Sequence, residues 1–264
     1  NKVSLRYYPR LLILTLINLI NWPFRTYERW FINPRFKKVE MEEPPIFIIG
    51  HWRSGTTHLH NLICQDPQMG YTTTYQVVFP DTFFNYLGSF IFKNFTKLLI
   101  PGRRKGDQVV LDTEYPQEEE FALGDKTPLS FYYWWMFPRK IMSFYEKKIR
   151  HTGVKTAQLD SWSEDYHLLM KKALAKSGKK VFISKNPPNT GRVHQLLRMF
   201  PNARFIHIHR HPVNVILSTR NFYDKMLPYL QLQTVNWEEL NDHILSMYPN
   251  IMSDFQEQKE MVPP

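Results

Sequence analysis

Residues 46–62 read IFIIGHWRSGTTHLHNL, and this stretch decides the fold. Its first four residues are β-branched or aromatic, as in a buried strand. A turn rich in Gly, Ser and Thr follows, and a helix-like segment leaves it. The first N–H groups of such a helix have no partner within it, and the helix dipole favours an anion at that end. The pattern therefore predicts a strand, a loop and a helix arranged to hold a phosphate.

The side chains of this loop suit a phosphate or a sulfate. Its glycines let the backbone come close to an anion, and its hydroxyl groups can donate hydrogen bonds. The guanidinium of Arg53 can contact two oxygens of such a group at once. An ordinary corner between a strand and a helix is the alternative, and this density of Gly, Arg and hydroxyl residues argues against it. The residues expected to bind the 5′ end of a nucleotide are Arg53, Ser54, Gly55, Thr56 and Thr57.

The spacing of the loop matches the P-loop of nucleotide hydrolases with one difference. Gly50 and Gly55 are separated by four residues, as in the P-loop pattern. Thr56 stands where a P-loop has its phosphate-binding Lys. Without that Lys, the loop is poorly equipped for magnesium-dependent hydrolysis of ATP or GTP.

RSGTT after a strand resembles the 5′-phosphosulfate loop of the sulfotransferases that use PAPS (3′-phosphoadenosine 5′-phosphosulfate), above all in their broad bacterial branch. A second motif supports the resemblance, because residues 203–218 read ARFIHIHRHPVNVILS. In the family, an Arg at a strand end and a Ser eight residues later bind the 3′-phosphate. Arg210 and Ser218 occupy these two positions. Such residues can reach one ligand in a doubly wound sheet, where ligands bind at the carboxyl ends of the strands.

A third match lies between these motifs, where residues 180–192 read KVFISKNPPNTGR. An apolar strand ends at Lys185. The resemblance implies that this Lys contacts the transferring sulfuryl group and neutralises charge on the bridging oxygen. Many cytosolic relatives have a catalytic His two residues later. Pro187 stands there in this chain, so the base must come from elsewhere.

The best source of a base is the segment PQEEEFAL at residues 116–123. It resembles the acidic segment of the bacterial branch, in which a Glu is thought to deprotonate the acceptor alcohol. Adjacent helical residues point about 100° apart, so the three glutamates cannot all serve. We favour Glu119, and Glu118 and Glu120 remain alternatives. A merely favourable acidic first turn of a helix is the competing interpretation.

The order of the expected elements predicts the fold. A strand, loop and helix are followed by a helical insert, a strand with a turn and helix, and a strand with an Arg and helix. This order predicts an α/β fold with a P-loop-like, doubly wound parallel sheet flanked by helices. Helical inserts are expected to cap the acceptor pocket.

The resemblance implies a direct in-line transfer. A Glu removes the proton of the acceptor while Lys185 and Arg53 stabilise charge on the sulfuryl and leaving phosphate oxygens. PAPS is the expected co-substrate, and its product is PAP (3′,5′-adenosine bisphosphate). No metal is expected. Two rival functions are a P-loop small-molecule kinase and a non-catalytic, membrane-associated nucleotide-binding protein.

Charge and composition agree with an anionic partner. The chain has 264 residues and a formal net charge of +10. A nucleotide or an anionic membrane surface would satisfy this charge. No block of Lys and Arg and no zinc or RNA-binding pattern indicates nucleic acid. Cys64 is the single cysteine, which excludes an internal disulfide and is compatible with the reducing cytoplasm.

The N-terminal segment is strongly apolar, with LLILTLINLI at residues 11–20. This run is shorter than the roughly 20 residues that cross a bilayer. Its aromatic and basic flanks fit a helix that lies in the membrane interface, and packing on the enzyme's own core is the equal alternative. We expect residues 1–43 to form a helical arm and residues 44–264 the sulfotransferase domain. The protein is expected to be cytoplasmic, with peripheral membrane attachment as a possibility.

Aromatic residues are dense in 71–95 and 129–145. Apolar alcohols need aromatic and aliphatic walls with few polar anchors, whereas sugars need many hydrogen bonds. The sequence therefore favours a lipophilic acceptor such as a sterol, a lipid or a phenol.

Overall fold

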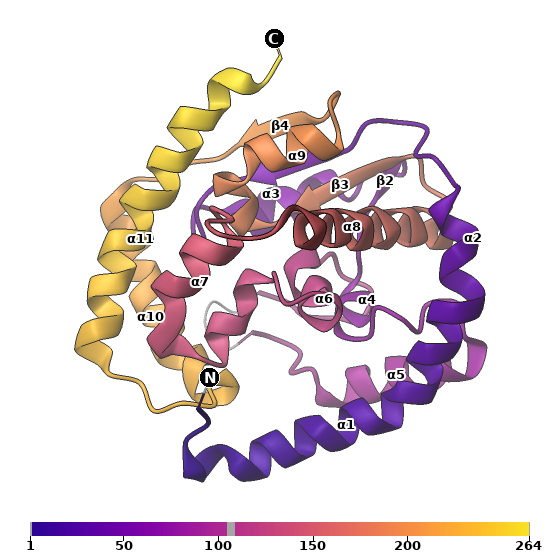
Figure 1. Cartoon of the computed structure of the whole chain (residues 1–264), viewed down its shortest axis with the longest axis horizontal. Helices are drawn as coiled ribbons and strands as arrows, with labels where there is room; N and C mark the ends of the chain where they lie inside the picture. Colours follow the sequence, from indigo (N-terminus) through magenta and orange to yellow (C-terminus); the bar gives the residue numbers. More distant parts are fainter. Residues whose placement is uncertain (1, 105–108, 264) are drawn as a thin grey trace.

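Four parallel strands in the order β2-β3-β1-β4 form the sheet of the computed structural model, which describes residues 2–104 and 109–263 (Figure 1). The central strand β1 pairs with β3 on one side and with β4 on the other. Ile46 lies opposite Ile183 on β3 and Arg204 on β4. The strands are β1 (Ile46–Ile49), β2 (Met69–Gly70), β3 (Val181–Lys185) and β4 (Arg204–His207).

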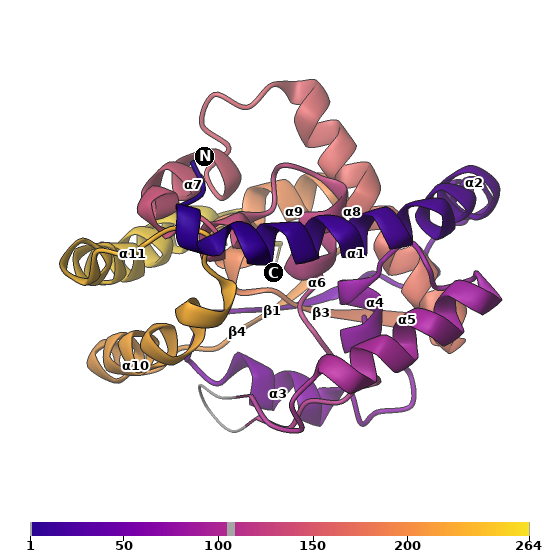
Figure 2. The same ribbon diagram turned by 90° about the horizontal axis from the view of Figure 1, so that it is seen from below.

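Helices cover both faces of this sheet, as Figure 2 shows with α3 on one side and α8 and α9 on the other. The expected doubly wound parallel α/β fold is therefore confirmed. The α-helices of the described residues are α1 (Tyr8–Tyr27), α2 (Asn33–Lys37), α3 (Thr56–Ile63), α4 (Thr74–Val78), α5 (Tyr86–Leu99), α6 (Glu119–Lys126), α7 (Ile141–Lys148), α8 (Thr156–Ser177), α9 (Val193–Met199), α10 (Pro212–Leu230) and α11 (Trp237–Gln258).

The side chains of β1 alternate between the two faces of the sheet. Phe47 and Ile49 are buried in a core with residues of α8 and α9, such as Met170 and Leu196. Because side chains of a strand point to opposite faces in turn, Ile48 faces the side on which α3 packs. Burial on both faces explains why this strand is a continuous apolar run.

The loop after β1 requires glycine at its first position. Gly50 has a φ of +148°, and a Cβ built there would lie 2.3 Å from the carbonyl oxygen of Ile208. Ile208 N–H donates a hydrogen bond of 3.0 Å to the carbonyl oxygen of Ile49. The phosphate loop and the chain after β4 therefore meet at one edge of the sheet.

The end of the N-terminal arm is fastened to the core by buried ion pairs. Glu28 lies 2.7 Å from Lys172 of α8. Asp81 lies 2.6 Å from Lys126 of α6 and 2.8 Å from Arg29. Removing one member of such a buried pair typically costs about 3–5 kcal/mol, because the other charge is left uncompensated. This attachment holds the arm on the core at residues 28–29, beyond α1.

No helix in the described part of the chain combines the length and the apolar content needed to cross a membrane.

Candidate active site

The two expected nucleotide-binding motifs meet in the structure. Arg53 Nε donates a hydrogen bond of 3.1 Å to Ser218 Oγ on α10. The Arg53 guanidinium also lies 4.9 Å from the ring centre of Phe222, one turn further along that helix. Arg53 has a φ of +70°, a left-handed conformation that non-glycine residues rarely adopt and that is frequent at ligand sites. The loop and α10 therefore present one continuous binding edge.

Arg210 lies in the segment between β4 and α10 and is exposed to solvent. No described residue forms a hydrogen bond or an ion pair with its guanidinium. Ser218 follows on α10 and is half-buried. The sequence prediction placed these two residues at one ligand; Ser218 bonds to Arg53 of the loop after β1, and Arg210 follows two residues after Ile208, which packs against Gly50 of that loop.

The loop residues surround the start of α3. Gly55 precedes the helix with a φ of +102°. Ser54 and Thr56 are buried, and Thr57 is half-buried. The N–H groups of the first turn lack partners within the helix, so they are available to an anion. The residues thus fit a phosphosulfate group at this helix end.

Lys185 ends β3 and is almost completely buried, with 1% of its surface exposed. Its Nζ lies 3.5 Å from Thr57 Oγ1 and forms an ion pair with Glu118. Burial lowers the pKa of Lys185, and the carboxylate of Glu118 opposes that shift. One ammonium group therefore connects the phosphate loop to the acidic segment.

Glu118 is held from a second side by an aromatic pair that the sequence prediction did not include. Tyr132 donates its hydroxyl hydrogen bond to Glu118 Oε2. Trp52 Nε1 in turn donates to the Tyr132 hydroxyl at 3.0 Å. Trp52 lies within the phosphate loop itself, and this position was the one sequence feature that could have pointed to the aromatic pair. The chain of bonds fixes the Glu118 carboxylate against Lys185.

Glu119, the preferred base in the sequence prediction, lies in the protein interior. Ser184 Oγ donates to Glu119 Oε2 at 2.7 Å, and the Tyr166 hydroxyl donates at 3.3 Å. The other carboxylate oxygen has no hydrogen-bond partner among the described residues. Burial raises the pKa of Glu119 to about 7. Its side chain does not reach the ammonium of Lys185 by a hydrogen bond.

Glu120 forms a buried ion pair with Arg192 at 2.7 Å. Asn186 Nδ2 donates to the same carboxylate oxygen at 2.9 Å. Burial alone would raise the pKa of Glu120, but Arg192 holds it below its usual range. These contacts give Glu120 a structural role away from Lys185, so the three glutamates do point in three directions.

The raised pKa of Glu119 makes a prediction about stability. Below pH 4.5 the carboxyl is protonated in both folded and unfolded chains. Between about pH 4.5 and 7 the unfolded chain ionises this carboxyl while the folded chain keeps it protonated, so stability falls over this range and the loss is complete as pH passes the folded pKa of about 7. The loss is expected to be about 3 kcal/mol. Denaturant unfolding of wild type and Glu119→Gln between pH 4.5 and 8 measures it, because Gln removes this component. An unchanged slope in Glu119→Gln would contradict the assignment.

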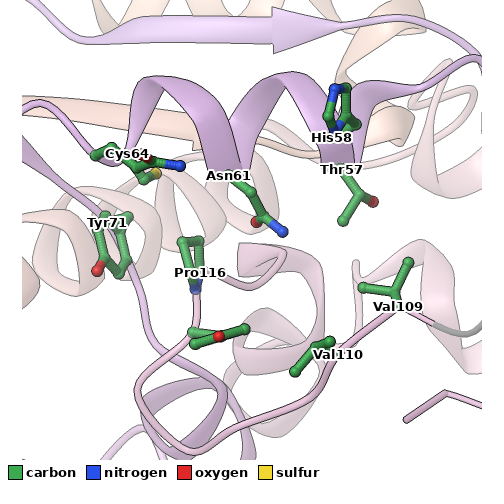
Figure 3. Close-up of a pocket in the computed structure, with 10 residues that line it drawn as sticks. Thr57, His58, Asn61, Cys64, Tyr71, Val109, Val110 and Pro116 are labelled. Carbon is green, nitrogen blue, oxygen red and sulfur yellow. The ribbon is translucent and has the colours of Figure 1, made fainter.

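A cavity of about 520 Å³ opens beside Thr57. Figure 3 shows Thr57 and Asn61 of α3 facing the segment that carries Val109 and Val110. The cavity is lined by Thr57, His58, Asn61, Cys64, Gln65, Tyr71, Val109, Val110, Tyr115 and Pro116. Thr57 lines the cavity and also contacts Lys185, so the cavity and the buried Lys185–Glu118 pair lie on either side of Thr57.

The structure corrects the expectation that aromatic residues form the walls of the acceptor cavity. Of the aromatic residues in 71–95 and 129–145, Tyr71 lines this cavity. Phe131, Trp134 and Trp135 instead pack in a core with α10 and α11. Phe79 and Phe92 form a smaller core that includes residues of α1. Packing against other helices buries more of these large aromatic side chains than lining an open cavity would.

Comparisons with known proteins bear on the family and the fold of the chain. A sequence model described as the sulfotransferase family matches residues 44–264. Omega-hydroxy-beta-dihydromenaquinone-9 sulfotransferase Stf3 of Mycobacterium bovis and of Mycobacterium tuberculosis is 29% identical over 252 residues, which are 96% of this chain and 64% of the relative.

Two solved structures share the fold. Sulfotransferase STF9 from Mycobacterium avium has a TM-score of 0.67 at 17% identity, and the match covers 90% of this chain and 60% of that one. Sulfotransferase STF1 from Mycobacterium tuberculosis has a TM-score of 0.65 at 15% identity, and covers 90% and 64%. The chain therefore spans just under two thirds of the length of these relatives.

Proposed function

Since this chain belongs to the sulfotransferase family, we propose that it transfers a sulfuryl group from PAPS to the hydroxyl of a lipophilic alcohol. The observation that carries the proposal is the position of Lys185, which contacts both Thr57 of the phosphate loop and Glu118. The Stf3 relative is named for a hydroxylated menaquinone, which supports a lipid acceptor here. Sterols and phenols belong to the same chemical class.

The two ends of the nucleotide are proposed to bind at the two motifs. Arg53 and the N–H groups at the start of α3 would hold the 5′-phosphosulfate. Arg210 and Ser218 would hold the 3′-phosphate. The exposed guanidinium of Arg210 and the bond between Arg53 and Ser218 support this assignment.

We propose Glu118 as the base rather than Glu119. Its carboxylate contacts Lys185, which would lie at the sulfuryl group, whereas Glu119 is enclosed by Ser184 and Tyr166. Glu118 takes the proton of the acceptor hydroxyl as the hydroxyl oxygen forms a bond to sulfur. The bond between sulfur and the bridging phosphate oxygen breaks, and PAP leaves with that oxygen. Lys185 and Arg53 neutralise the developing negative charge, and no step requires a metal.

The acceptor is proposed to bind in the cavity beside α3. Val109, Val110 and Tyr71 supply apolar surface, and Asn61 supplies a polar anchor. Thr57, His58 and Gln65 add further polar groups to the lining, so the apolar part of the acceptor is proposed to lie against the valines and Tyr71. We place the enzyme in the cytoplasm, at a membrane surface that holds such alcohols.

Calorimetric binding of PAP tests the donor. Wild type is expected to bind PAP in preference to AMP and to ATP with magnesium. Arg210→Ala is expected to weaken PAP binding about 10- to 100-fold, since hydrogen bonds to charged groups are worth about 1.5–3 kcal/mol. Arg198→Ala, an exposed Arg on α9, is the matched control and should bind as wild type does.

The other outcomes of that measurement separate the rival functions. Preference for ATP with magnesium would favour a small-molecule kinase and overturn the proposal. Binding of PAP without any transfer from radiolabelled PAPS to sterol, phenol or long-chain alcohol acceptors would favour a non-catalytic binding protein. Transfer to sugars alone would contradict the lipophilic acceptor.

A further inference from the structure

Helix α1 turns its apolar side away from the protein. Asn21 is buried with 6% of its surface exposed, whereas Leu12 and Leu19 are 59% and 62% exposed. At about 100° per residue, the exposed side chains form one arc of the helix. The large apolar side chains of that arc are Leu12, Ile13, Leu16, Leu19, Ile20 and Trp22, while Leu14, Thr15 and Asn18 are also exposed on α1. A surface helix of a globular protein normally turns its apolar side toward the core and its polar side toward water.

Helix α5 extends this apolar surface. Phe24 of α1 packs edge-on against Phe92 of α5, with ring centres 5.4 Å apart. Figure 2 shows both helices on the near side of the molecule. Phe90 and Leu98 of α5 are 64% and 82% exposed. We call the exposed apolar residues of α1 and α5 the two-helix face, because the two helices that carry them pack against each other.

Charge around the two-helix face is of one sign. Residues 1–27 and 82–104 contain no Asp or Glu, although the chain has 24 of them. The same two segments contain eight basic residues: Lys2, Arg6, Arg10, Arg25, Lys93, Lys97, Arg103 and Arg104. An apolar helical face with basic flanks and no acids is complementary to a bilayer with anionic headgroups.

The two-helix face also adjoins the proposed acceptor cavity. Lys93 of α5 forms an ion pair of 2.9 Å with Glu114. The next residue, Tyr115, lines the cavity, as does Val110, and both are 43% exposed. The middle of α5 therefore lies near the cavity, whose volume of about 520 Å³ holds only the head of a long lipid.

We propose that the two-helix face docks on an anionic lipid bilayer and that the acceptor enters the cavity from that bilayer. Its hydroxyl-bearing head would lie near Thr57, and its tail would remain among the lipids. This inference rests on the proposed function for the nature of the acceptor. The docking itself does not depend on catalysis.

Flotation with vesicles tests the docking. Wild type is expected to float with vesicles of phosphatidylcholine and phosphatidylglycerol, and to float less with phosphatidylcholine alone or at high salt. Leu16→Glu/Leu19→Glu on α1 and Phe90→Glu on α5 are expected to lower the partition coefficient about tenfold or more. Leu245→Glu/Met261→Glu is the matched control, because these two exposed apolar residues lie outside the face.

Transfer assays then separate docking from catalysis. Hexadecanol in anionic vesicles is the membrane acceptor, and 1-naphthol is the soluble one. The α1 double variant is expected to lose about tenfold with hexadecanol and to keep its rate with 1-naphthol. Retained PAP binding and an unchanged melting temperature show that the variant is folded.

Several results would overturn the inference. If wild type stays in the lipid-free fraction, the membrane-docking inference is wrong. If that same protein still sulfates 1-naphthol, the proposed function stands. A lipid-free dimer by light scattering that Leu16→Glu/Leu19→Glu dissociates would make a second copy the occupant of the face. Flotation without transfer to any acceptor would support the docking and contradict the proposed function.

Discussion

Lys185→Ala is expected to lower turnover about 100- to 1,000-fold, the cost of removing one preorganised donor at a site of developing charge. Lys185 is the single described cation that contacts both the phosphate loop and an acidic side chain of the proposed site. Its ammonium would stabilise the bridging oxygen as the sulfur–oxygen bond breaks. Single-turnover transfer from radiolabelled PAPS to 1-naphthol measures the effect directly.

Controls separate this role from a structural one. Lys180→Ala, at the exposed beginning of β3, should keep wild-type turnover. The affinity for PAP should change little in Lys185→Ala, because the residue acts on the transferring group. Lys185→Met alone leaves the buried Glu118 carboxylate unpaired. The double variant Lys185→Met/Glu118→Gln removes that carboxylate, so it should melt at a higher temperature than the single variant. Full turnover in Lys185→Ala would contradict the proposed mechanism.

Glu118→Gln is expected to lower turnover about 100- to 10,000-fold, the range for loss of a general base. The amide keeps the shape of the side chain and can still accept from Tyr132, but Lys185 loses its carboxylate, so the melting temperature of the variant is measured beside its turnover. Glu119→Gln is the matched comparison at the neighbouring position. It should lower turnover far less, because Glu119 bonds to Ser184 and Tyr166 instead of Lys185.

The order of the two effects decides the base. A large loss in Glu119→Gln with near-normal turnover in Glu118→Gln would return the role to Glu119.

Much of the fold followed from local pattern. The run 46–49 and the glycines after it predicted β1 and its loop, because a buried strand is apolar throughout and Gly50 is the residue whose missing Cβ fits against Ile208. Arg210 and Ser218 were named from the resemblance to the family, and their role at a nucleotide stays a prediction. The cavity walls did not follow, because aromatic residues suit a closed core and an open pocket equally well, and burial decides between them.

The sequence by itself determined the phosphate loop, the position of Lys185 at a strand end and the presence of an acidic helix start, since each depends on a few neighbouring residues. Only the tertiary structure decided which Glu meets Lys185. The packing of α6 against α8 and the 131–135 turn sets the rotation of the acidic segment, directing Glu120 to Arg192 and Glu118 to Lys185. The outward direction of the apolar side of α1 was settled in the same way, because a helix has a face only in relation to what it packs against.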